Sequence, residues 1–224
     1  MSDKTVKNII IIMSGGVGNR FGADRPKQYT LLKGRPVIDY VIDAAKGSKV
    51  ADAVVVVMDP SCIDYSEELK SSGFTFALNG KERLDSLKSA FDCIKENYPD
   101  CEGIIILDAV APFVTSELID DYLTRLDEND AVITCQKITG ALGNYDYDPL
   151  DREQFYMTQS PEAFRFKVIT KYFTTTFPSQ ELAWQMPRET KKYLNFNFKN
   201  NLKLTYDFEA HYAEYLLEYL KDKQ

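Results

Sequence analysis

Four short apolar stretches recur along the chain and give the first indication of its fold. The first is Ile9 to Met13, two more rich in Val and Ile lie at 51–59 and 102–110, and a further one begins at about residue 129. Such short, uninterrupted apolar runs are typical of parallel strands that are covered on both faces. They therefore predict the strands of a buried sheet.

Helical patterns lie between these runs. Residues 35–48 have apolar side chains at helical spacing, residues 82–100 form an amphipathic pattern stopped by Pro99, and residues 115–130 begin with Thr115 or Ser116 as an N-cap. Strands that alternate with helices indicate an α/β fold of three layers, Rossmann-like, with a mostly parallel sheet. Ligands of such folds bind at the carboxyl ends of the strands.

The pattern changes from about Gly140 to Ser160. This stretch is rich in Gly, Tyr, Asp and Pro and has no helical period. It predicts an excursion from the sheet, with a protruding arm or hairpin at about 140–158. The chain from 191 onward then predicts one more strand, a short polar interruption and a closing helix. No linker is evident, so we expect one domain over residues 1–224 that carries the arm.

Composition narrows the class of protein. The net charge of −7 argues against a surface built for nucleic acid, although it leaves room for a local basic pocket. The run from Ile9 to Met13 is too short to span a bilayer, and Met1 to Asn8 lacks the apolar region of a secretory signal. We therefore expect a cytoplasmic protein without membrane or nucleic-acid partners. The four cysteines lack metal-ligand spacing, and the single histidine, His211, lies in an amphipathic stretch.

The first strand ends in the glycine-rich sequence SGGVGNRF, residues 14–21. Glycines at a strand-to-helix turn expose backbone N–H groups that bind phosphate oxygens well. The dinucleotide pattern G-x-G-x-x-G fails at Phe21, and no Gly-Lys-Ser/Thr closes a Walker A loop. Two interpretations remain: a phosphate-binding loop served by Arg20 and Lys27, or a tight turn with two solvated cations.

Five segments, taken together, favour the first interpretation. They are SGGVGNRF followed by RPKQYTLLKGRPVI, NGKERLDSL at 79–87, LDAVAPF at 107–113, DREQFYMTQSPEAF at 151–164 and NLKLTYDFE at 201–209. In this order and spacing they resemble the signature of the CTP-dependent cytidylyltransferases that include the methylerythritol-phosphate, ribitol-phosphate and glycerol-phosphate enzymes. The resemblance spans nearly the whole chain and implies a nucleotidyltransferase fold.

The resemblance implies roles for individual residues. The residues implied in nucleotide binding are Ser14, Gly15, Gly16, Gly18, Gly80, Arg83, Ser86 and Asp108. Those implied in catalysis are Arg20, Lys27 and Lys203. Asp108 would in addition hold Mg²⁺, and CTP would be the nucleotide.

The residues implied at the acceptor site are Ala111, Thr139 and Arg152. In the family, an arginine on the arm reaches the acceptor site of the partner subunit, and Arg152 corresponds to it. The resemblance therefore implies a homodimer with interlocked arms.

The implied chemistry agrees with these residue types. An oxygen of a phosphomonoester attacks the α-phosphorus of CTP, and pyrophosphate leaves in line. The nucleophile is already anionic, so the reaction needs positive charge around the transition state more than a histidine base. Arg20, Lys27, Lys203 and Mg²⁺ would supply that charge.

The sequence departs from the family pattern on the acceptor side. Ala111 replaces the arginine of D-A-[AV]-R-P, Ser179 and Gln180 stand near the family's Thr-Asp, and the alignment around Thr139 is poor. Sequence drift in a working enzyme is one explanation, and an acceptor other than methylerythritol phosphate is another. We favour the second, because losing an arginine that faces an anion costs on the order of 1–3 kcal/mol. We expect one cation fewer and more room beside Asp108.

The sequence thus predicts a cytidylyltransferase that acts on a small phosphorylated polyol or similar phosphomonoester and forms a CDP-linked precursor of surface polysaccharide or teichoic-acid-type polymers. One alternative is the same chemistry on methylerythritol phosphate in isoprenoid synthesis. Another is a non-catalytic nucleotide-binding protein or a Rossmann-type oxidoreductase. The intact cations Arg20, Lys27 and Lys203 argue against non-catalytic binding, and Phe21 argues against the oxidoreductase.

Overall fold

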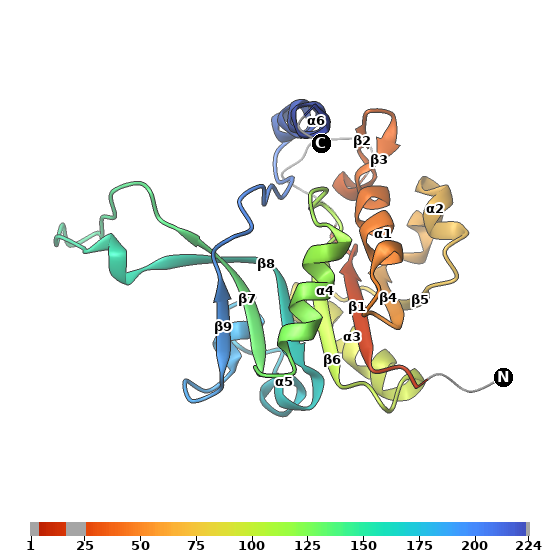
Figure 1. The fold of residues 1–224 in the computed structure, drawn as a ribbon, viewed down its shortest axis with the longest axis horizontal. Coiled ribbons are helices and arrows are strands. Elements are labelled where there is room, and N and C mark those ends of the chain that lie inside the picture. Colours follow the sequence, from red (N-terminus) through yellow and green to blue (C-terminus); the bar gives the residue numbers. More distant parts are fainter. Residues whose placement is uncertain (1–4, 17–25, 223–224) are drawn as a thin grey trace.

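A seven-stranded sheet forms the centre of the computed structural model, which describes residues 5–16 and 26–222 (Figure 1). Its strands in chain order are β1 (Asn8–Met13), β4 (Ala53–Met58), β5 (Thr75–Leu78), β6 (Gly103–Asp108), β7 (Ala131–Lys137), β8 (Tyr156–Arg165) and β9 (Lys192–Asn195). The four apolar stretches of the sequence are β1, β4, β6 and β7, so these strand predictions are confirmed.

The strands are arranged in the order β5-β4-β1-β6-β8-β7-β9. The chain passes from β1 outward to β4 and β5 on one side, and then returns to β6 on the other side of β1. These four strands are parallel. Because the order reverses beside β1, the carboxyl ends of β1 and β6 border the crevice in which ligands of open α/β sheets bind.

Helices cover both faces of the sheet (Figure 1). They are α1 (Val37–Gly47) and α4 (Ser116–Arg125) on one face, and α3 (Arg83–Asn97) and α5 (Phe166–Tyr172) on the other. Alternate side chains of β1 pack against the two helical layers. Ile10 and Ile12 pack with α1 and α4, whereas Ile9 and Ile11 pack with α3 and α5. A strand buried on both faces has no polar alternation, which explains why the run is continuously apolar.

The three predicted helices form with slightly shorter bounds. Thr115 is the N-cap of α4, and its Oγ1 accepts a hydrogen bond of 3.2 Å from the Leu118 N–H. Helix α3 ends at Asn97, two residues before Pro99. The closing helix is α6 (Phe208–Lys221). The capping residues and the proline therefore set the helix ends as the sequence predicts.

Strand β8 corrects the prediction of an excursion that continues to residue 160. Residues Tyr156–Arg165 return to the sheet and pair antiparallel with both β6 and β7. Ala163 and Phe164 are fully buried there, so this part of β8 belongs to the hydrophobic core. A buried hydrogen bond of 2.7 Å, donated by Thr134 Oγ1 of β7 to the Pro161 carbonyl, joins the two strands.

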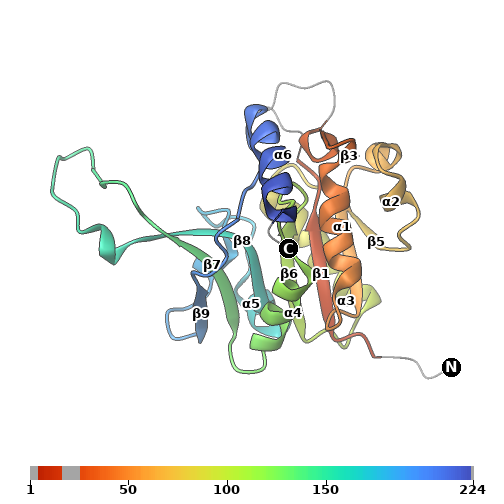
Figure 2. The same ribbon diagram turned by 45° about the horizontal axis from the view of Figure 1, so that its top comes forward.

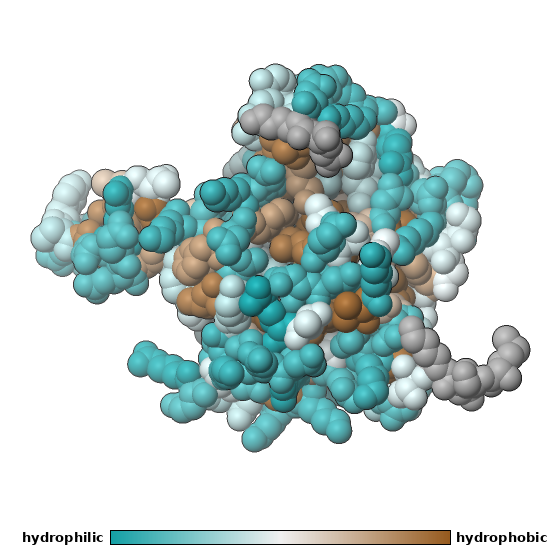
Figure 3. Space-filling view, in the orientation of Figure 1, coloured by the Kyte–Doolittle hydropathy of each residue, from teal (hydrophilic) through white to brown (hydrophobic). Residues whose placement is uncertain are grey.

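The segment between β7 and β8, residues 138–155, extends away from the rest of the molecule (Figure 1). Its only helical turn among the described residues is the 3₁₀ helix η3 (Arg152–Gln154). Tyr145 and Tyr147 are fully exposed at 104% and 95%, and Leu150 and Phe155 are also exposed. Figure 3 shows polar and apolar residues side by side on this arm. Within one chain nothing in the described part covers these aromatic side chains.

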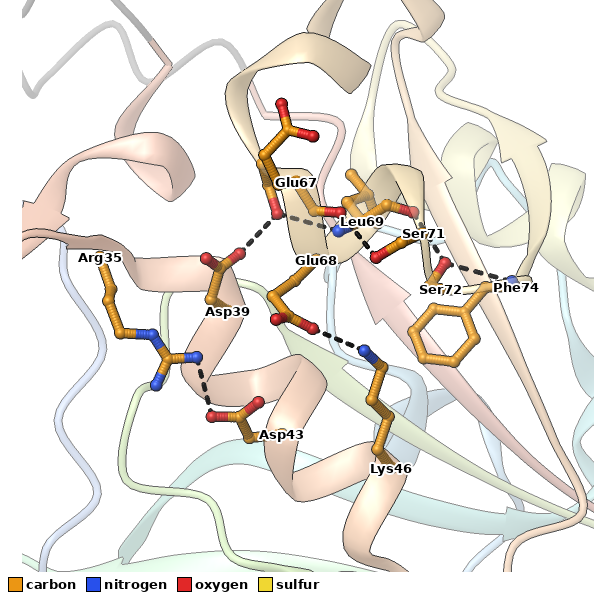
Figure 4. A network of polar contacts seen from close by, with 11 residues as sticks. Arg35, Asp39, Asp43, Lys46, Glu67, Glu68, Leu69, Ser71, Ser72 and Phe74 are labelled. Atoms are coloured by element: carbon orange, nitrogen blue, oxygen red, sulfur yellow. Dashed lines mark hydrogen bonds and ion pairs between the residues drawn. The ribbon is translucent and has the colours of Figure 1, made fainter.

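Helix α2 (Glu67–Lys70) is attached to α1 by polar contacts (Figure 4). Ser66 Oγ donates a 2.5 Å hydrogen bond to the buried carboxylate of Asp39, and Lys46 pairs with Glu68 at 2.6 Å. Burial raises the pKa of Asp39, and the Ser66 hydrogen bond opposes that rise. These contacts hold α2 against α1 at the surface, and the residues that make them do not line the cleft described below.

Helix α6 lies at the end of the molecule to which β1 and β6 point (Figure 2). Its Ala213 packs with Leu32, Val37, Val110 and Leu204 in a small separate core. None of the helices in the described residues is both long enough and apolar enough to span a membrane. The remaining short elements are η1 (Lys27–Tyr29), β2 (Leu31–Leu32), β3 (Arg35–Pro36), η2 (Pro60–Tyr65) and η4 (Leu182–Gln185).

Candidate active site

A cleft of about 420 Å³ opens where the parallel strands end. Met13, the last residue of β1, is in register with Asp108, the last residue of β6. The chain therefore turns off the sheet at the same level in both strands, and Asn79 follows β5 nearby. The described residues that line the cleft are Met13, Gly15, Gly16, Lys27, Gln28, Asn79, Gly80, Lys81, Glu82, Arg83, Ser86, Asp108, Val110 and Lys203.

Two glycines of the cleft are required by close packing. A Cβ on Gly15 would lie 2.3 Å from the Cβ of Asn79, and a Cβ on Gly80 would lie 2.3 Å from the Cβ of Asp85. Asn79 Nδ2 also donates a 3.3 Å hydrogen bond to the Gly15 carbonyl. Gly16 has open space around it, so its surroundings in the described chain do not exclude a side chain. Gly15 thus lets the first loop approach Asn79, and Gly80 lets its own loop pack on the first turn of α3.

Ser14 points away from the cleft. Its side chain is buried, with Oγ 3.3 Å from the Tyr29 hydroxyl, and its carbonyl accepts a 2.6 Å hydrogen bond from Gln28 Nε2. Burial raises the pKa of Tyr29 to about 12, so this phenol stays neutral. Ser14 therefore supports the first turn of the glycine loop, and the cleft itself begins at Gly15.

The amino terminus of α3 forms one wall of the cleft. Glu82 and Asp85 make a capping box, in which each side chain accepts from the other residue's backbone N–H. Ser86 Oγ accepts a 2.9 Å hydrogen bond from the Gly80 N–H and donates one of 3.1 Å to the Glu82 carbonyl. These bonds hold the loop on the helix, whose positive dipole end then faces the space where an anion would lie.

Asp108 lies between two cations. Arg83 Nη1 is 2.7 Å from its Oδ1, and Lys203 Nζ is 2.7 Å from its Oδ2. Burial alone would raise the pKa of this carboxyl, which is 3% exposed, but Arg83 and Lys203 outweigh burial and hold the pKa well below its usual range. The same pairing raises the pKa of Arg83. The site therefore carries a fixed carboxylate and two fixed positive charges.

The C-terminal segment brings Lys203 to the cleft. The Leu204 N–H donates to the Val110 carbonyl at 2.9 Å, and the buried Leu204 side chain anchors the segment beside α6. From the other side, Lys27 Nζ donates a 3.4 Å hydrogen bond to the Leu204 carbonyl. Lys27 and Lys203 are far apart in the sequence, but both line the opening of the cleft.

The residue types present fit a magnesium ion that arrives with phosphate. Mg²⁺ is usually held by one or two carboxylates together with substrate phosphates and water. Asp108 Oδ2 is buried, and apart from its ion pair with Lys203 no donor among the described residues contacts it with hydrogen-bond geometry. The described residues contain no cluster of three His, Cys, Asp or Glu that could hold a metal alone. Asp108 would therefore share the ion with phosphate oxygens.

Several predicted site residues are not among the described residues that line this cleft. Gly18 and Arg20 lie outside the described residues. Ala111 is 2% exposed, belongs to the core cluster with Val114 and does not line the described cleft, so more room beside Asp108 than an arginine would leave stays a prediction. Its N–H donates to the Asp108 carbonyl at 3.1 Å.

Two acceptor residues lie on the arm. Arg152 Nη1 donates a 2.7 Å hydrogen bond to the Thr139 carbonyl, which joins the two sides of the arm near its base. Neither residue lines the cleft of its own chain. Most of the predicted nucleotide-binding residues thus line one cleft, whereas the predicted acceptor residues Thr139 and Arg152 lie apart from it in the same chain.

The structure adds residues that sequence reasoning missed. Asn79, Lys81 and Glu82 line the cleft beside the predicted Gly80 and Arg83, and Gln28 follows Lys27. The sequence could have indicated these residues only through their position next to predicted site residues, since they lie within the segments NGKERLDSL and RPKQYTLL. Among the described residues, the lining contains four cations and two carboxylates, which gives a local positive balance in a chain of net charge −7.

Comparison with known proteins identifies relatives of this chain. The bifunctional enzyme IspD/IspF of Pelagibacter ubique is 31% identical over 172 residues, which make up 73% of this chain and 44% of that protein. The bifunctional ribulose 5-phosphate reductase/CDP-ribitol pyrophosphorylase Bcs1 of Haemophilus influenzae is 28% identical over 178 residues, 75% of this chain and 37% of that protein. The chain thus spans less than half the length of these two relatives.

Other proteins match this chain over nearly their whole length. The 2-C-methyl-D-erythritol 4-phosphate cytidylyltransferase of Caldicellulosiruptor bescii is 24% identical over 223 residues, 95% of this chain and 98% of that protein. The crystal structure of 4-diphosphocytidyl-2C-methyl-D-erythritol synthase from Anaerococcus prevotii superimposes with a TM-score of 0.79 at 22% identity, covering 95% of this chain and 96% of that one. This structural likeness confirms the predicted nucleotidyltransferase fold.

A sequence profile of the 2-C-methyl-D-erythritol 4-phosphate cytidylyltransferase (IspD) family matches residues 8–191, which include the glycine loop, the start of α3 and the end of β6. Since this match covers most of the chain, the protein belongs to that family of CTP-dependent cytidylyltransferases.

Proposed function

We propose that the protein transfers CMP from CTP to a small phosphorylated polyol or a similar phosphomonoester, releases pyrophosphate, and forms a CDP-linked precursor of surface polysaccharide or teichoic-acid-type polymers. The observation that carries the transfer reaction is the cleft at the ends of β1 and β6, where Lys27, Arg83 and Lys203 surround an opening bounded by a glycine loop. This arrangement supplies the positive charge that a phosphoryl-transfer transition state requires.

The residues of the cleft have distinct parts in this reaction. The Gly15–Gly16 turn and the start of α3 offer backbone dipoles to the triphosphate, and the Ser86 bonds hold the loop that faces the nucleotide. Lys27 and Lys203 stand where charge gathers as the α-phosphorus is attacked. Mg²⁺, when bound at Asp108, would neutralise phosphate charge and orient the leaving pyrophosphate.

The choice of a polyol phosphate rests on Ala111. In the family pattern this position carries an arginine, and here its place is a buried methyl group in the core. An acceptor phosphate in a pocket needs cationic partners, because an unpaired buried charge is heavily penalised. The acceptor pocket of this chain therefore differs in charge from the family pattern. The Haemophilus influenzae relative, named a CDP-ribitol pyrophosphorylase, supports a pentitol phosphate as one candidate.

Methylerythritol phosphate is the second candidate acceptor. It is favoured by the family profile and by the name of the full-length relative from Caldicellulosiruptor bescii. The two candidates predict the same nucleotide and the same cleft, so only the acceptor distinguishes them.

A panel of substrates tests this proposal. With CTP and Mg²⁺, we expect kcat/KM for a pentitol or glycerol phosphate to exceed that for methylerythritol phosphate by about tenfold or more, because discrimination is a difference in transition-state binding. CTP should be preferred over ATP, GTP and UTP. The measurement is pyrophosphate release, with each nucleotide in the absence of acceptor as the control. Methylerythritol phosphate as the best acceptor would establish the second candidate.

The protein should also act as a cytoplasmic homodimer. The exposed aromatic side chains of the arm, Tyr145 and Tyr147, are not covered by the described part of their own chain. Arg152 and Thr139 are likewise remote from their own cleft. Both observations are accounted for if the arm packs on a second subunit and brings Arg152 to the acceptor pocket there.

Replacing Arg152 tests this assembly. We expect Arg152→Ala to raise KM for the acceptor by roughly tenfold, the size of a lost hydrogen bond to a charged group, while KM for CTP stays unchanged. Lys191→Ala, which removes an exposed cation outside the arm and the cleft, is the matched control. Light scattering at the assay concentration should give the mass of two chains. A monomer with full activity would contradict the role of Arg152 in a partner's site.

A further inference from the structure

The segment that carries Lys203 has no regular structure of its own. Residues 196–207 connect β9 to α6 without a helix or a strand (Figure 1). The Leu204 N–H, which donates to the Val110 carbonyl at 2.9 Å, fixes this segment directly after Lys203. A lysine side chain is long and flexible, so the position of its ammonium group depends on how firmly the backbone is held on both sides of the residue.

Asn201 supplies an attachment on the other side of Lys203. Its Nδ2 donates a 2.7 Å hydrogen bond to the Ser160 carbonyl and a 3.0 Å hydrogen bond to Gln159 Oε1. Both N–H groups of the amide are thereby used, and both acceptors belong to β8. In the described part of the chain, these are the hydrogen bonds that join residues 196–203 to β8. Asn201 therefore fastens the segment to the sheet two residues before Lys203.

Ser160 also contacts the backbone of Asp108. The regular pairing of β6 and β8 ends before Asp108, and there Ser160 Oγ accepts a 3.3 Å hydrogen bond from the Asp108 N–H. Lys203 Nζ lies 2.7 Å from Oδ2 of the same aspartate. Asp108, Ser160, Asn201 and Lys203 thus form a closed ring of contacts, in which the Asn201 amide joins the sheet to the lysine segment.

The Asn201 amide is also connected to the base of the arm. Gln159 Nε2 donates a 2.8 Å hydrogen bond to Gln136 Oε1 of β7. The arm, residues 138–155, extends from the ends of β7 and β8. Asn201 therefore links the Lys203 segment to both strands that carry the arm.

We propose that Asn201 is a positioning residue for the transfer of CMP, because its amide holds Lys203 against Asp108 by fastening the segment of the lysine to β8. This inference rests on the proposed part of Lys203 in the reaction. Asn201 does not line the described cleft, so it acts through Lys203 and not through contact with the nucleotide.

Loss of the amide should change the placement of Lys203 more than the fold. Leu202 and Leu204 pack in the small core beside α6, and this packing remains when the amide is removed. A displacement of about 1 Å in a catalytic arrangement can lower the rate by about 10²-fold. Because Lys203 itself and the Leu204 hydrogen bond are still present, the loss should be smaller than that caused by removing Lys203.

Asn201→Ala and Asn201→Asp test the proposal. Aspartate has the shape of asparagine but lacks the N–H donors, so it breaks both hydrogen bonds without leaving a cavity. We expect each variant to lower kcat by roughly tenfold, the size of two lost hydrogen bonds, with a smaller change in KM for CTP. Asn200→Ala and Asn200→Asp are matched controls with normal turnover, because Asn200 is exposed and does not line the cleft.

Gln159→Ala is a milder variant in which the fold is less at risk. It removes one of the two acceptors and leaves the Ser160 carbonyl, so kcat should fall by about two- to threefold, the size of one hydrogen bond. Circular dichroism confirms that each variant is folded. Unchanged kcat in Gln159→Ala and Asn201→Asp would overturn the inference.

A double-mutant cycle shows whether Asn201 acts through Lys203. If it does, adding Asn201→Ala to Lys203→Ala should change kcat by less than about twofold, because the group that Asn201 positions is already absent. A role of Asn201 that is independent of Lys203 would lower kcat by the same factor in both backgrounds. Such equal factors would contradict the proposal.

Hydrogen exchange separates this inference from the proposed function. The backbone amide of Leu204, which is bonded to Val110, should exchange faster in Asn201→Asp than in the unchanged protein and in Asn200→Asp, because its segment has lost one of its two attachments. Equal exchange in the three proteins would overturn the inference. Faster exchange in a protein that transfers CMP to no acceptor would instead contradict the proposed function and leave the attachment by Asn201 established.

Discussion

Replacing Lys203 by alanine is expected to lower kcat by roughly 10²-fold or more, with a smaller change in the KM for CTP. Lys203 is held at the cleft by the segment that the Leu204–Val110 hydrogen bond fixes, and its amino group already faces an anion, the carboxylate of Asp108. A cation placed in this way stabilises charge that develops in the transition state more than charge already present in bound CTP. Lys27→Ala should behave similarly, since Lys27 lines the same opening.

Steady-state kinetics with CTP and the best acceptor measure this effect, and circular dichroism confirms that the variants are folded. Lys199→Ala is a suitable control because Lys199 is exposed, lies on the same C-terminal segment and does not line the cleft. Near-normal turnover in both Lys27→Ala and Lys203→Ala would show that these lysines are solvated cations without a catalytic part.

Replacing Asp108 by asparagine is expected to lower the unfolding free energy at pH 7 by about 2–3 kcal/mol. Removing one partner of a buried ion pair leaves the other charge without compensation. The loss should be smaller than for a fully enclosed pair, because the side chains of Arg83 and Lys203 are 25% and 47% exposed. The variant should also lose activity, since the carboxylate that fixes both cations is gone.

The pH dependence of this difference has a defined sign. The pKa of Asp108 is lowered in the folded protein, so its stabilising contribution is complete above the ordinary carboxyl pKa of 3.8 and is lost as pH falls further. Denaturant unfolding at pH 7 should show the full gap between the two proteins, and unfolding at pH 3 a smaller one. Asp43→Asn, which breaks an exposed pair with Arg35, should cost less than about 1 kcal/mol. A gap that widens toward acid pH would contradict this account of Asp108.

Local sequence patterns predicted a large part of the fold. The apolar runs marked β1, β4, β6 and β7 because strands covered on both faces must be apolar throughout. Thr115 and Pro99 marked the ends of helices because a cap and a proline act on neighbouring residues of the chain. Strand β8 was missed because its stretch contains Gln159, Ser160 and Pro161, and its place between β6 and β7 depends on partners that no local period reveals.

In the candidate site, too, the sequence indicated single residues, whereas the contacts between them depend on the tertiary structure. Motif resemblance brought Gly15, Gly80 and Asp108 to attention, and the structure places all three at one cleft. The sequence also determined that Arg83 and Lys203 are cations. Their joint pairing with Asp108 was decided by tertiary structure, because it requires the end of β6, the start of α3 and a C-terminal segment fixed beside α6 to meet.

Tertiary structure alone decided the orientation and environment of individual side chains. Ser14 turns toward Tyr29, Ala111 packs into the core, and Glu162 is buried beside Ile106 and Ile133. A sequence specifies which groups a chain carries and which local conformations they prefer. Burial, the charges that surround a carboxyl group and the pKa that results depend on neighbours contributed by distant segments, and these neighbours are fixed only when the sheet and its two helical layers pack together.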